Sequence, residues 1–536
     1  MANESTGRRA FLRSATAAGA LLAIPGAGLA KEASRAKEGE AKKSAFDVTA
    51  FGARGDGKAI DTPAVNKAIE AAAAAGGGTV DFPAGTYACY SIHLKSHVAL
   101  RLSHGTTILA AEPAAAGGPG QYDEAESNKP WEDYQDYGHN HWHNSLIWGE
   151  GIEDVSIIGP GLIWGKGLSR GTRELPRAET AGVGNKAIAL KNCHNVLLRD
   201  FSILHGGHFG ILATGVDNLT IDHLKIDTNR DGMDIDCCLN VRVSNCTVNS
   251  PWDDGICLKS SYALGKARAT EMVTISDCLV TGDYEEGTVL DASYKHFSPG
   301  FRVGRTGRIK FGTESNGGFK NVTITNCVFD GCRGLALESV DGALLEDVAV
   351  SNITMRDIFG PPIFLRLGSR MRGPEGVPVG AIRRVTISNI VCSNATSPAS
   401  SIISGIPGHE IEDLKLHDIL IQHQGGGTKE QAAFQPEEKE NAYPEPTMFG
   451  PTPSHGFFIR HVKNLEMNGV RIMSQQPDAR PAFVLHDVKN AELFQIKVPE
   501  NQASPTLVLK DVKDFRIGRS EPVADTQVKE AKEKEL

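Results

Sequence analysis

A short segment with alternating apolar residues recurs along most of this chain, about every 22 to 26 residues. Clear copies begin at Asn195, Asn218 and Asn240. Further copies begin near these positions: Met272, Asn321, Asp347, Arg384, Asp413, Asn464 and Asn490. Each copy has a short strand, a polar turn and a second short strand, and such a unit cannot bury its apolar side alone. The repeat therefore predicts an all-β solenoid, a right-handed parallel β-helix whose stacked coils form the core.

Two other repeat architectures fit this pattern less well. The leucine spacing of leucine-rich repeats is absent, and a β-propeller needs longer, four-stranded periods. An Asn or Asp falls at one register in the turns of five copies: Asn245, Asp277, Asn326, Asn352 and Asn389. Such side chains bond turn backbone, and stacked copies form a ladder. We expect these residues to be structural.

The ten cysteines follow the repeat. Four of them occupy matching or neighbouring places in their copies: Cys193, Cys246, Cys278 and Cys327. Cys237 and Cys238 are adjacent and cannot easily pair with each other, and no Cys-x-x-Cys pair indicates zinc. We therefore expect stacked small core residues rather than disulfides.

The segments beside the repeats have different patterns. Residues 61–75 predict a helix with Asp61 or Thr62 as its N-cap. This helix is expected to cover the N-terminal end of the solenoid, where bare strand edges would invite association. The catalytic β-helix domain is predicted at 46–521, and the charged residues 522–536 predict a disordered tail.

Residues 1–30 predict a twin-arginine export signal. Arg8 and Arg9 precede an apolar stretch at 17–29, which is rich in Ala and Gly and too short to span a membrane well. Residues 31–45 form a charged linker. The expected location is periplasmic or secreted, with no membrane attachment after the signal is removed.

Composition limits the possible partners. The net charge is −9 and the isoelectric point is about 6.0, so no basic face for a nucleic acid is indicated. An acidic polysaccharide would need a locally basic site. Residues 113–145 and 424–455 are long Pro- and Gly-containing excursions, and loops of this length in a compact repeat are often functional.

Two groups of aspartates lie one repeat apart and indicate acid/base chemistry. Asp231 precedes Asp253 by 22 positions, and Asp254 follows directly. If each period is one coil, the three carboxylates meet on adjacent coils. Close carboxylates cannot all ionise easily, so one pKa rises and a proton donor stays available. The alternative interpretation is that these Asp-Gly pairs only form turns.

The chain resembles glycoside hydrolase family 28, the polygalacturonase and rhamnogalacturonan hydrolase family, over about residues 46–500. Residues 51–57 are similar to a cap motif of many pectin-active β-helices, which is not specific for one reaction. Residues 229–231 and 253–254 are similar to the Asn-Thr-Asp and Asp-Asp motifs of the family, with Arg230 in place of Thr.

The resemblance implies a role for each motif residue. Asp253 would be the general acid, Asp231 and Asp254 would activate water, and Asn229 would contact the sugar. The implied reaction is inverting hydrolysis of a pectic polysaccharide or oligosaccharide, without a metal or cofactor. Inversion usually requires about 6.5–9.5 Å between the acid and the base.

The chain departs from the family pattern after these motifs. Residues 308–310 are Arg-Ile-Lys, but the following residues 311–315 look like the stretch after the Gly-His-Gly motif of the family. In that register, Ala336 and Glu338 take the places of the expected Arg and Lys, and 281–306 is an insertion. The spacing from the aspartates supports the other register, in which 308–310 is the Arg-Ile-Lys motif itself. We favour the first, because a strand is harder to slip than a loop.

Several charged or polar residues are candidates for contacting the substrate: Lys259, Arg305, Arg308, Lys310, Arg333, Glu338 and His208. The alternative for each cation is solvated solenoid surface. The displaced charges argue against an ordinary endo-polygalacturonase and favour a rhamnogalacturonan-type or exo-acting enzyme.

The first excursion carries His139, His141 and His143, which on a strand would share one side. That arrangement suits a metal, a sugar-binding wall or a plain loop. Four aromatic residues of this excursion either stack on sugars or pack the loop: Trp131, Tyr134, Tyr137 and Trp142.

Two rival functions remain open. One is a lyase of the pectate-lyase type, which eliminates the linkage by removing a proton. The other is a non-catalytic carbohydrate-binding solenoid. The sequence does not decide the pectic linkage, endo or exo action, or the oligomeric state.

Overall fold

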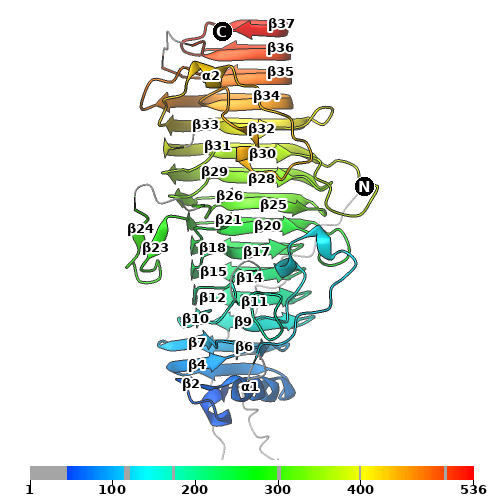
Figure 1. The fold of residues 1–536 in the computed structure, drawn as a ribbon, viewed down its shortest axis with the longest axis vertical. Helices are drawn as coiled ribbons and strands as arrows, with labels where there is room; N and C mark the ends of the chain where they lie inside the picture. The colour runs from blue at the N-terminus through cyan, green and yellow to red at the C-terminus, as the bar shows by residue number, and fades with distance from the viewer. Residues whose placement is uncertain (1–44, 114–120, 172–175, 299–303, 397–399, 500–503) are drawn as a thin grey trace, which may run out of the picture. The chain divides into compact units, whose positions relative to one another are not determined.

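The computed structural model describes residues 45–536 except 114–120, 172–175, 299–303, 397–399 and 500–503. Residues 43–536 form one compact unit, in which coils of parallel strands stack in chain order (Figure 1). The export signal predicted at 1–30, and all but the last residue of the linker predicted at 31–45, lie outside the described residues. No helix in the described part of the chain is long and apolar enough to cross a membrane.

The coils contribute strands to three parallel rows, and the strands of each row pair from coil to coil. The first row, named the site face below, contains β5 (Ile92–His93), β8 (Ile147–Glu150), β11 (Lys186–Lys191), β14 (Phe209–Thr214), β17 (Asp231–Asp236), β20 (Ile256–Ser260), β25 (Ile309–Ser315), β28 (Leu335–Ser339), β30 (Ile363–Leu367) and β32 (Ser401–Ser404). The second contains β1 (Ala45–Asp47), β3 (Gly78–Phe82), β6 (Val98–Leu102), β9 (Glu153–Ile158), β12 (His194–Arg199), β15 (Asp217–Asp222), β18 (Leu239–Ser244), β21 (Thr270–Ser276) and β26 (Phe319–Thr325). The third contains β2 (Asp56–Ile60), β4 (Gly85–Cys89), β7 (Thr106–Ala110), β10 (Leu162–Trp164), β13 (Ser202–Leu204), β16 (Lys225–Asp227), β19 (Thr247–Asn249), β22 (Leu279–Thr281) and β27 (Val328–Asp330). The predicted parallel β-helix is confirmed.

Towards the C-terminus, single long strands run through more than one row. These are β29 (Leu344–Arg356), β31 (Ala381–Ala395), β33 (Ile411–His423), β34 (Phe457–Ser474), β35 (Phe483–Phe494) and β36 (Leu507–Gly518). β29, for example, pairs with both β26 and β27. The strands therefore continue through turn positions such as Asn352 in β29 and Asn389 in β31, which keep a positive φ, and the coils stay in register.

The charged tail predicted at 522–536 is not disordered. Residues Thr526–Glu535 form β37, which pairs antiparallel with β36. Val528 and Ala531 are buried, while most of the charged neighbours are exposed. The prediction was wrong because an edge strand needs only a few apolar contacts once its backbone pairs with the strand edge of the last coil.

Apolar side chains at equivalent positions of successive coils stack on one another and form the core. Ile188, Ile211, Met233, Ile256 and Ile309 lie in register on adjacent strands of the site face, and all are fully buried. Burial of a side chain of this size stabilises the folded state by about 1.5–3 kcal/mol. This stacking explains why one coil alone cannot fold.

The predicted Asn ladder is present in the turns. Asn326, Asn352 and Asn389 have φ of 56°, 57° and 52°, a left-handed conformation that Asn tolerates. The Asn352 amide donates to Asn326 at 3.0 Å, and the Asn389 amide donates to Asn352 at 2.7 Å. The polar register of the repeat is therefore structural.

The N-terminal cap contains η1 (Val48–Phe51) and α1 (Thr62–Ala74), as the sequence predicts in outline. Asp61 is the N-cap residue, as one of the two predicted candidates, but its side chain makes no capping bond. Its carboxylate instead accepts from the backbone N–H groups of Arg54 and Gly55 at 2.7 and 3.0 Å. The Thr62 hydroxyl oxygen accepts from the Tyr90 N–H. Both side chains thus join the helix to neighbouring chain segments. All ten cysteines are free and buried, as predicted.

Two excursions, residues 121–145 and 424–455, pack on the outer side of the site face. The first contains η2 (Glu132–Tyr134) and η3 (Tyr137–His139), and its Trp142 packs against Phe209 and Leu212. The second contains α2 (Lys429–Ala432) and η4 (Pro446–Phe449), and its Phe449 packs against Phe364 and Phe458. A separate hairpin, β23 (Tyr284–Glu286) with β24 (Lys295–His296), lies in the predicted insertion between β20 and β25.

Candidate active site

Three aspartates from adjacent coils come together on the site face. Asp231 begins β17, and Asp253 and Asp254 directly precede β20, which pairs with β17. One carboxylate oxygen from each aspartate lies within 4.8 Å of the other two. The spacing of one period in the sequence therefore becomes a contact between neighbouring coils, as predicted.

The three carboxylates differ in exposure. Asp231 and Asp254 are buried, whereas the Asp253 side chain is 27% exposed. Two oxygens 4.8 Å apart can share one water, because two hydrogen bonds of about 2.8 Å span that distance. The arrangement can therefore hold a water between two aspartates while the third meets the substrate.

Asp254 is held as an anion by two cations. The Arg308 Nε donates to Asp254 at 2.8 Å, and the Lys310 Nζ lies 3.1 Å from the other carboxylate oxygen. Burial alone would raise the pKa of Asp254, but Lys310 and Arg308 outweigh burial and hold this pKa below its ordinary value. These two cations therefore favour the ionised form of Asp254.

The pKa values of Asp231 and Asp253 are shifted in the opposite direction from that of Asp254. Burial, followed by repulsion from Asp234 and Asp253, raises the pKa of Asp231 well above its ordinary value. Burial and the charge of Asp254 raise the pKa of Asp253, and Arg230 opposes this rise. The cluster therefore combines one fixed anion with two carboxyl groups that can keep a proton, which is what acid/base catalysis requires.

The Arg-Ile-Lys segment lies at the start of β25 on the site face. Ile309 pairs with Ile256 on β20, and Lys310 pairs with Ala336 on β28. The segment 308–310 is therefore one coil after the paired aspartates, and Glu338 lies one coil further on.

Glu338 is buried beside the same two cations. Its carboxylate oxygens lie 4.0 Å from Arg308 and 3.8 Å from Lys310, and neither oxygen has a hydrogen-bond partner. Burial raises the pKa of Glu338 to about 7, although both cations act to lower it. Asp254 and Glu338 thus compete for one pair of cations.

Lys259 belongs to a second buried network. Its Nζ lies 2.8 Å from Glu314 and 3.8 Å from Asp234, and its exposed fraction is 8%. The His139 Nε2 lies 3.0 Å from Asp234, and Arg372 donates to Glu314 at 3.0 Å. Lys259 is therefore a buried partner of protein carboxylates, although its charge also acts on the aspartate cluster.

The other candidate ligands have individual positions. Arg305 pairs with Asp283 at 2.9 Å and stacks on Phe359, so its described partners are outside the aspartate cluster. His208 is buried and stacks on Phe209, one coil before Asp231.

Burial and the nearby Arg230 hold the pKa of His208 well below its ordinary value, so the ring is neutral. Asn229 is half-buried, and its carbonyl accepts from the Trp252 N–H at 2.9 Å.

The second excursion adds two residues that the sequence interpretation did not single out as site residues. Glu445 pairs with Arg333 at 2.6 Å and approaches Arg308 at 3.7 Å. Tyr443 is 50% exposed, and its ring centre lies 6.0 Å from the Lys310 Nζ. An exposed aromatic ring beside a buried ionic cluster can stack on a sugar.

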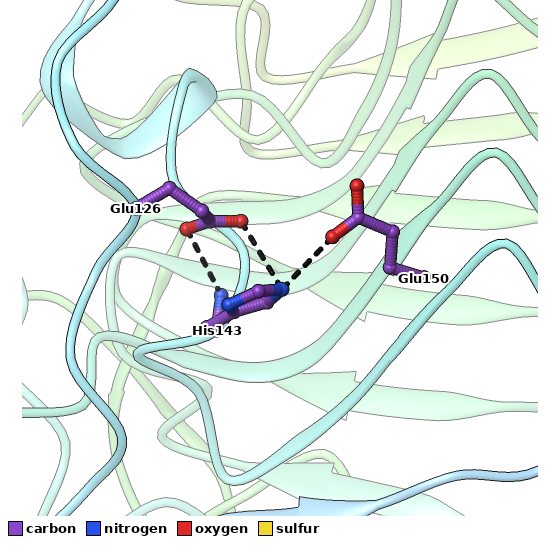
Figure 2. A group of neighbouring side chains, drawn as sticks. All are labelled: Glu126, His143 and Glu150. Carbon is purple, nitrogen blue, oxygen red and sulfur yellow. Dashed lines mark hydrogen bonds and ion pairs between the residues drawn. The ribbon is translucent and has the colours of Figure 1, made fainter.

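The three histidines of the first excursion do not share a metal site. His139 meets Asp234, whereas His141 stacks on Tyr137. Figure 2 shows His143 between Glu126 and Glu150, with its Nε2 at 3.6 and 2.9 Å from the two carboxylates. The predicted common face is wrong, because this segment is a short 3₁₀ turn followed by bends rather than a strand.

Among the residues that the structure describes, two groups of ligand atoms are compact enough for a cation. They are the three aspartates and the group of Glu126, His143 and Glu150. In the second group Lys191 already lies 2.9 Å from Glu150. In the first, Lys310 and Arg308 contact both oxygens of Asp254. Both groups are therefore already supplied with positive charge by the protein.

The chain matches two family models. One describes a right handed beta helix region and matches residues 178–307, and the other describes "Rhamnogalacturonase A/epimerase, pectate lyase-like" and matches 45–108. An exo-poly-α-D-galacturonosidase of Dickeya chrysanthemi is 39% identical over 70 residues, which are 13% of this chain and 11% of that protein. A probable polygalacturonase of Vitis vinifera is 22% identical over 405 residues, which are 69% of this chain and 73% of that protein. Over these stretches the chain is similar in sequence to polygalacturonases.

The fold of the chain is also similar to that of a solved structure. The solved structure of a family 28 exopolygalacturonase from Yersinia enterocolitica has a TM-score of 0.61 and 19% identity, and the match covers 84% of this chain and 78% of that one. The fold that the predicted resemblance implies is thus confirmed, while the chain spans only about a tenth of its Dickeya relative.

Proposed function

We propose that this chain hydrolyses an α-linkage of a pectic polysaccharide, one built of galacturonate or of galacturonate with rhamnose. The observation that carries the proposal is the contact of three carboxylates from adjacent coils, one of them fixed as an anion by Arg308 and Lys310. Glycoside hydrolysis needs one protonated and one ionised carboxyl group at the same bond. The relationship to polygalacturonases gives the same reaction class.

The mechanism follows from the exposure of each aspartate. Asp253 meets solvent and gives its proton to the glycosidic oxygen as the bond from that oxygen to the anomeric carbon breaks. A water held by Asp231 and Asp254 forms the new bond to the anomeric carbon. It gives one proton to Asp254, the ionised carboxylate, while Asp231 holds the water by a hydrogen bond. Both proton transfers occur within one compact cluster, and no covalent sugar intermediate is required.

The stereochemistry is a test of this mechanism. Nearest oxygens within 4.8 Å are closer than the usual 6.5–9.5 Å of inverting enzymes and resemble the spacing of about 5–5.5 Å in retaining ones. We nevertheless expect inversion, because the third carboxylate lets the water bind beside the cluster rather than between acid and base. Proton NMR of the first product anomer measures this directly, and a retained anomer would contradict the water-activating role.

The arrangement of the excursions favours exo action. Both pack on the site face, the first on strands before the aspartate coils and the second on strands after them. Chain segments on both sides limit the length of polymer that can pass across the site. We therefore expect release of one or two sugars from a chain end, and chromatography of the early products tests this.

The deciding experiment is incubation with a panel of defined oligomers of homogalacturonan, rhamnogalacturonan and xylogalacturonan. The wild-type protein should release new reducing ends from one of them. Asp253→Asn should lower this rate by about 10²–10⁴-fold without loss of the fold, because general acid catalysis contributes about that much. Retained activity in that variant would remove Asp253 from its role.

Two other outcomes identify the rival functions. An unsaturated product with ultraviolet absorbance would indicate a lyase, which removes a proton instead of adding water. Binding to pectin without new ends from any fraction would indicate a carbohydrate-binding solenoid. Each outcome would replace the hydrolase proposal.

We also propose export of the chain through the twin-arginine pathway. Arg8 and Arg9 before an apolar stretch support this proposal. Fractionation of cells that express the chain, with an Arg8→Lys and Arg9→Lys variant as control, tests the pathway. Accumulation of both forms in the cytoplasm would contradict it.

A further inference from the structure

One ion pair of the site differs from the others in its exposure. The Arg230 Nη2 donates to the Asp253 carboxylate at 2.8 Å, and the two side chains are 34% and 27% exposed. The pairs of Asp254 with Arg308 and of Lys259 with Glu314 are at most 8% exposed. The ion pair of Arg230 with Asp253 is thus much more exposed than the pairs that Asp254 makes with Arg308 and Lys310.

The backbone on both sides of this pair is fixed. The Ser250 hydroxyl donates to the carbonyls of Arg230 and Asp253, and Gly307 donates its N–H to the Asp253 carbonyl at 2.8 Å. The second oxygen of Asp253 accepts from the Asp254 N–H at 3.0 Å. Exchange of partners is therefore confined to the Arg230 side chain and one carboxylate oxygen.

The paired state does not suit the proposed role of Asp253. A guanidinium bound to a carboxyl group favours its ionised form. A carboxyl group that must deliver a proton is then less often protonated. A free uronate carboxylate offers the same guanidinium two parallel hydrogen bonds. A substrate of this class can therefore take Arg230 away from Asp253.

We propose that Arg230 is a positioning residue that binds the carboxylate of a uronate next to the scissile bond and thereby releases Asp253 to act as a proton donor. This inference rests on the proposed hydrolase function. It assigns a uronate to the sugar that meets Arg230, and it couples recognition of the acidic group to activation of the acid. A neutral sugar in that position leaves the ion pair intact, so Asp253 stays ionised and has no proton to donate.

The pH dependence of the reaction tests the coupling. The basic limb of kcat/KM reports the acid of the free enzyme, and that of kcat reports the acid in the substrate complex. With a galacturonide, the wild-type basic limb should lie at higher pH in kcat than in kcat/KM, by about one pH unit or more. With the carboxyl-reduced galacturonide, the two limbs should coincide.

Variants of Arg230 give the matched comparison. In Arg230→Gln, both limbs should lie at the higher pH, and KM for the galacturonide should rise about ten- to a hundredfold, as expected for loss of a charged hydrogen bond. KM for the carboxyl-reduced substrate should not change. Arg230→Lys should restore part of the separation between limbs, and Arg101→Gln, which breaks a pair with Asp81 in the first coils, should behave as wild type.

Two results would overturn the inference. One is an Arg230→Gln profile with unchanged limbs and an unchanged KM for the galacturonide. The other is equal affinity of wild type and Arg230→Gln for digalacturonate in calorimetry.

The calorimetry is the deciding measurement if wild type hydrolyses no pectic oligomer, a result that would defeat the proposed function by itself. A ten- to hundredfold loss of affinity in Arg230→Gln would then support carboxylate binding by Arg230.

Discussion

Two ion pairs on neighbouring coils of the site face have the same chemistry and opposite surroundings. Lys259 and Glu314 lie in a dry network, whereas Arg230 and Asp253 are each about one-third exposed. A buried pair has replaced its hydration with fixed partners, so loss of one partner leaves an uncompensated charge. An exposed pair is screened and contributes little to stability. The first pair therefore stabilises the fold, and the second can exchange partners during function.

The partners of the two pairs show the same contrast. The network of Lys259 and Glu314 also includes His139 of the first excursion, through Asp234, and Arg372 of the segment after β30. It therefore fastens loops to the sheet. The ion pair of Arg230 with Asp253 joins the two turns that carry the aspartates.

The largest expected effect is on the buried pair. Lys259→Met should lower the free energy of unfolding by about 3–5 kcal/mol, because two buried carboxylates would lose the cation that they share. Glu314 would keep Arg372, and Asp234 would keep His139. Urea unfolding of the variant and wild type at neutral pH measures this loss.

A double variant separates the buried charge from the loss of packing. Lys259→Met with Glu314→Gln should recover part of the stability, since the uncompensated carboxylate is then removed. A single variant as stable as wild type would mean that water reaches this network and that the contrast with Arg230 is wrong.

Glu338 lies between the two cases, because it is buried beside cations but has no hydrogen-bond partner. Its pKa is raised from 4.5 to about 7 by burial. Between these values the folded state binds a proton that the unfolded state has lost, so stability falls as pH rises from about 4.5 to 7. The fall attributable to this group is at most about 3 kcal/mol.

Glu338→Gln tests this assignment with its own internal control. The two proteins should have similar free energies of unfolding at and below about pH 4.5, where Glu338 is largely protonated in the folded state and at least half protonated in the unfolded state. Above pH 7 it should be the more stable protein by up to about 3 kcal/mol, as measured by urea unfolding across the pH range. Parallel pH curves for the two proteins would show that Glu338 is ionised throughout.

The fold was predictable because its pattern repeats. Alternating strands and a turn Asn at one register, such as Asn326 and Asn352, specify the same coil many times, and each copy supports the others. The edges were harder to predict because they occur once. The strand at 526–535 has only a few buried apolar side chains, and Asp61 bonds backbone outside its helix.

The aspartate cluster was predictable for the same reason, since Asp231 and Asp253 are one period apart. The contribution of Glu445 was not, because an excursion returns to the sheet at a point that no period determines. Asp234 and Glu314 did carry a signal. A carboxylate inside an otherwise buried strand indicates a charged partner, and that partner is Lys259 in both cases.

The smallest expected effect belongs to the exposed pair, and it completes the contrast. Arg230→Gln should change the free energy of unfolding by less than about 1 kcal/mol, because solvent screens the charge that remains on Asp253. Arg101→Gln, which breaks another solvent-facing pair, should do the same. Added salt should reduce the difference from wild type, while the loss in Lys259→Met should persist because a dry network is screened little. A loss of several kcal/mol in Arg230→Gln would make Arg230 a structural residue, fixed in place as firmly as Lys259 and unable to leave Asp253 for a substrate.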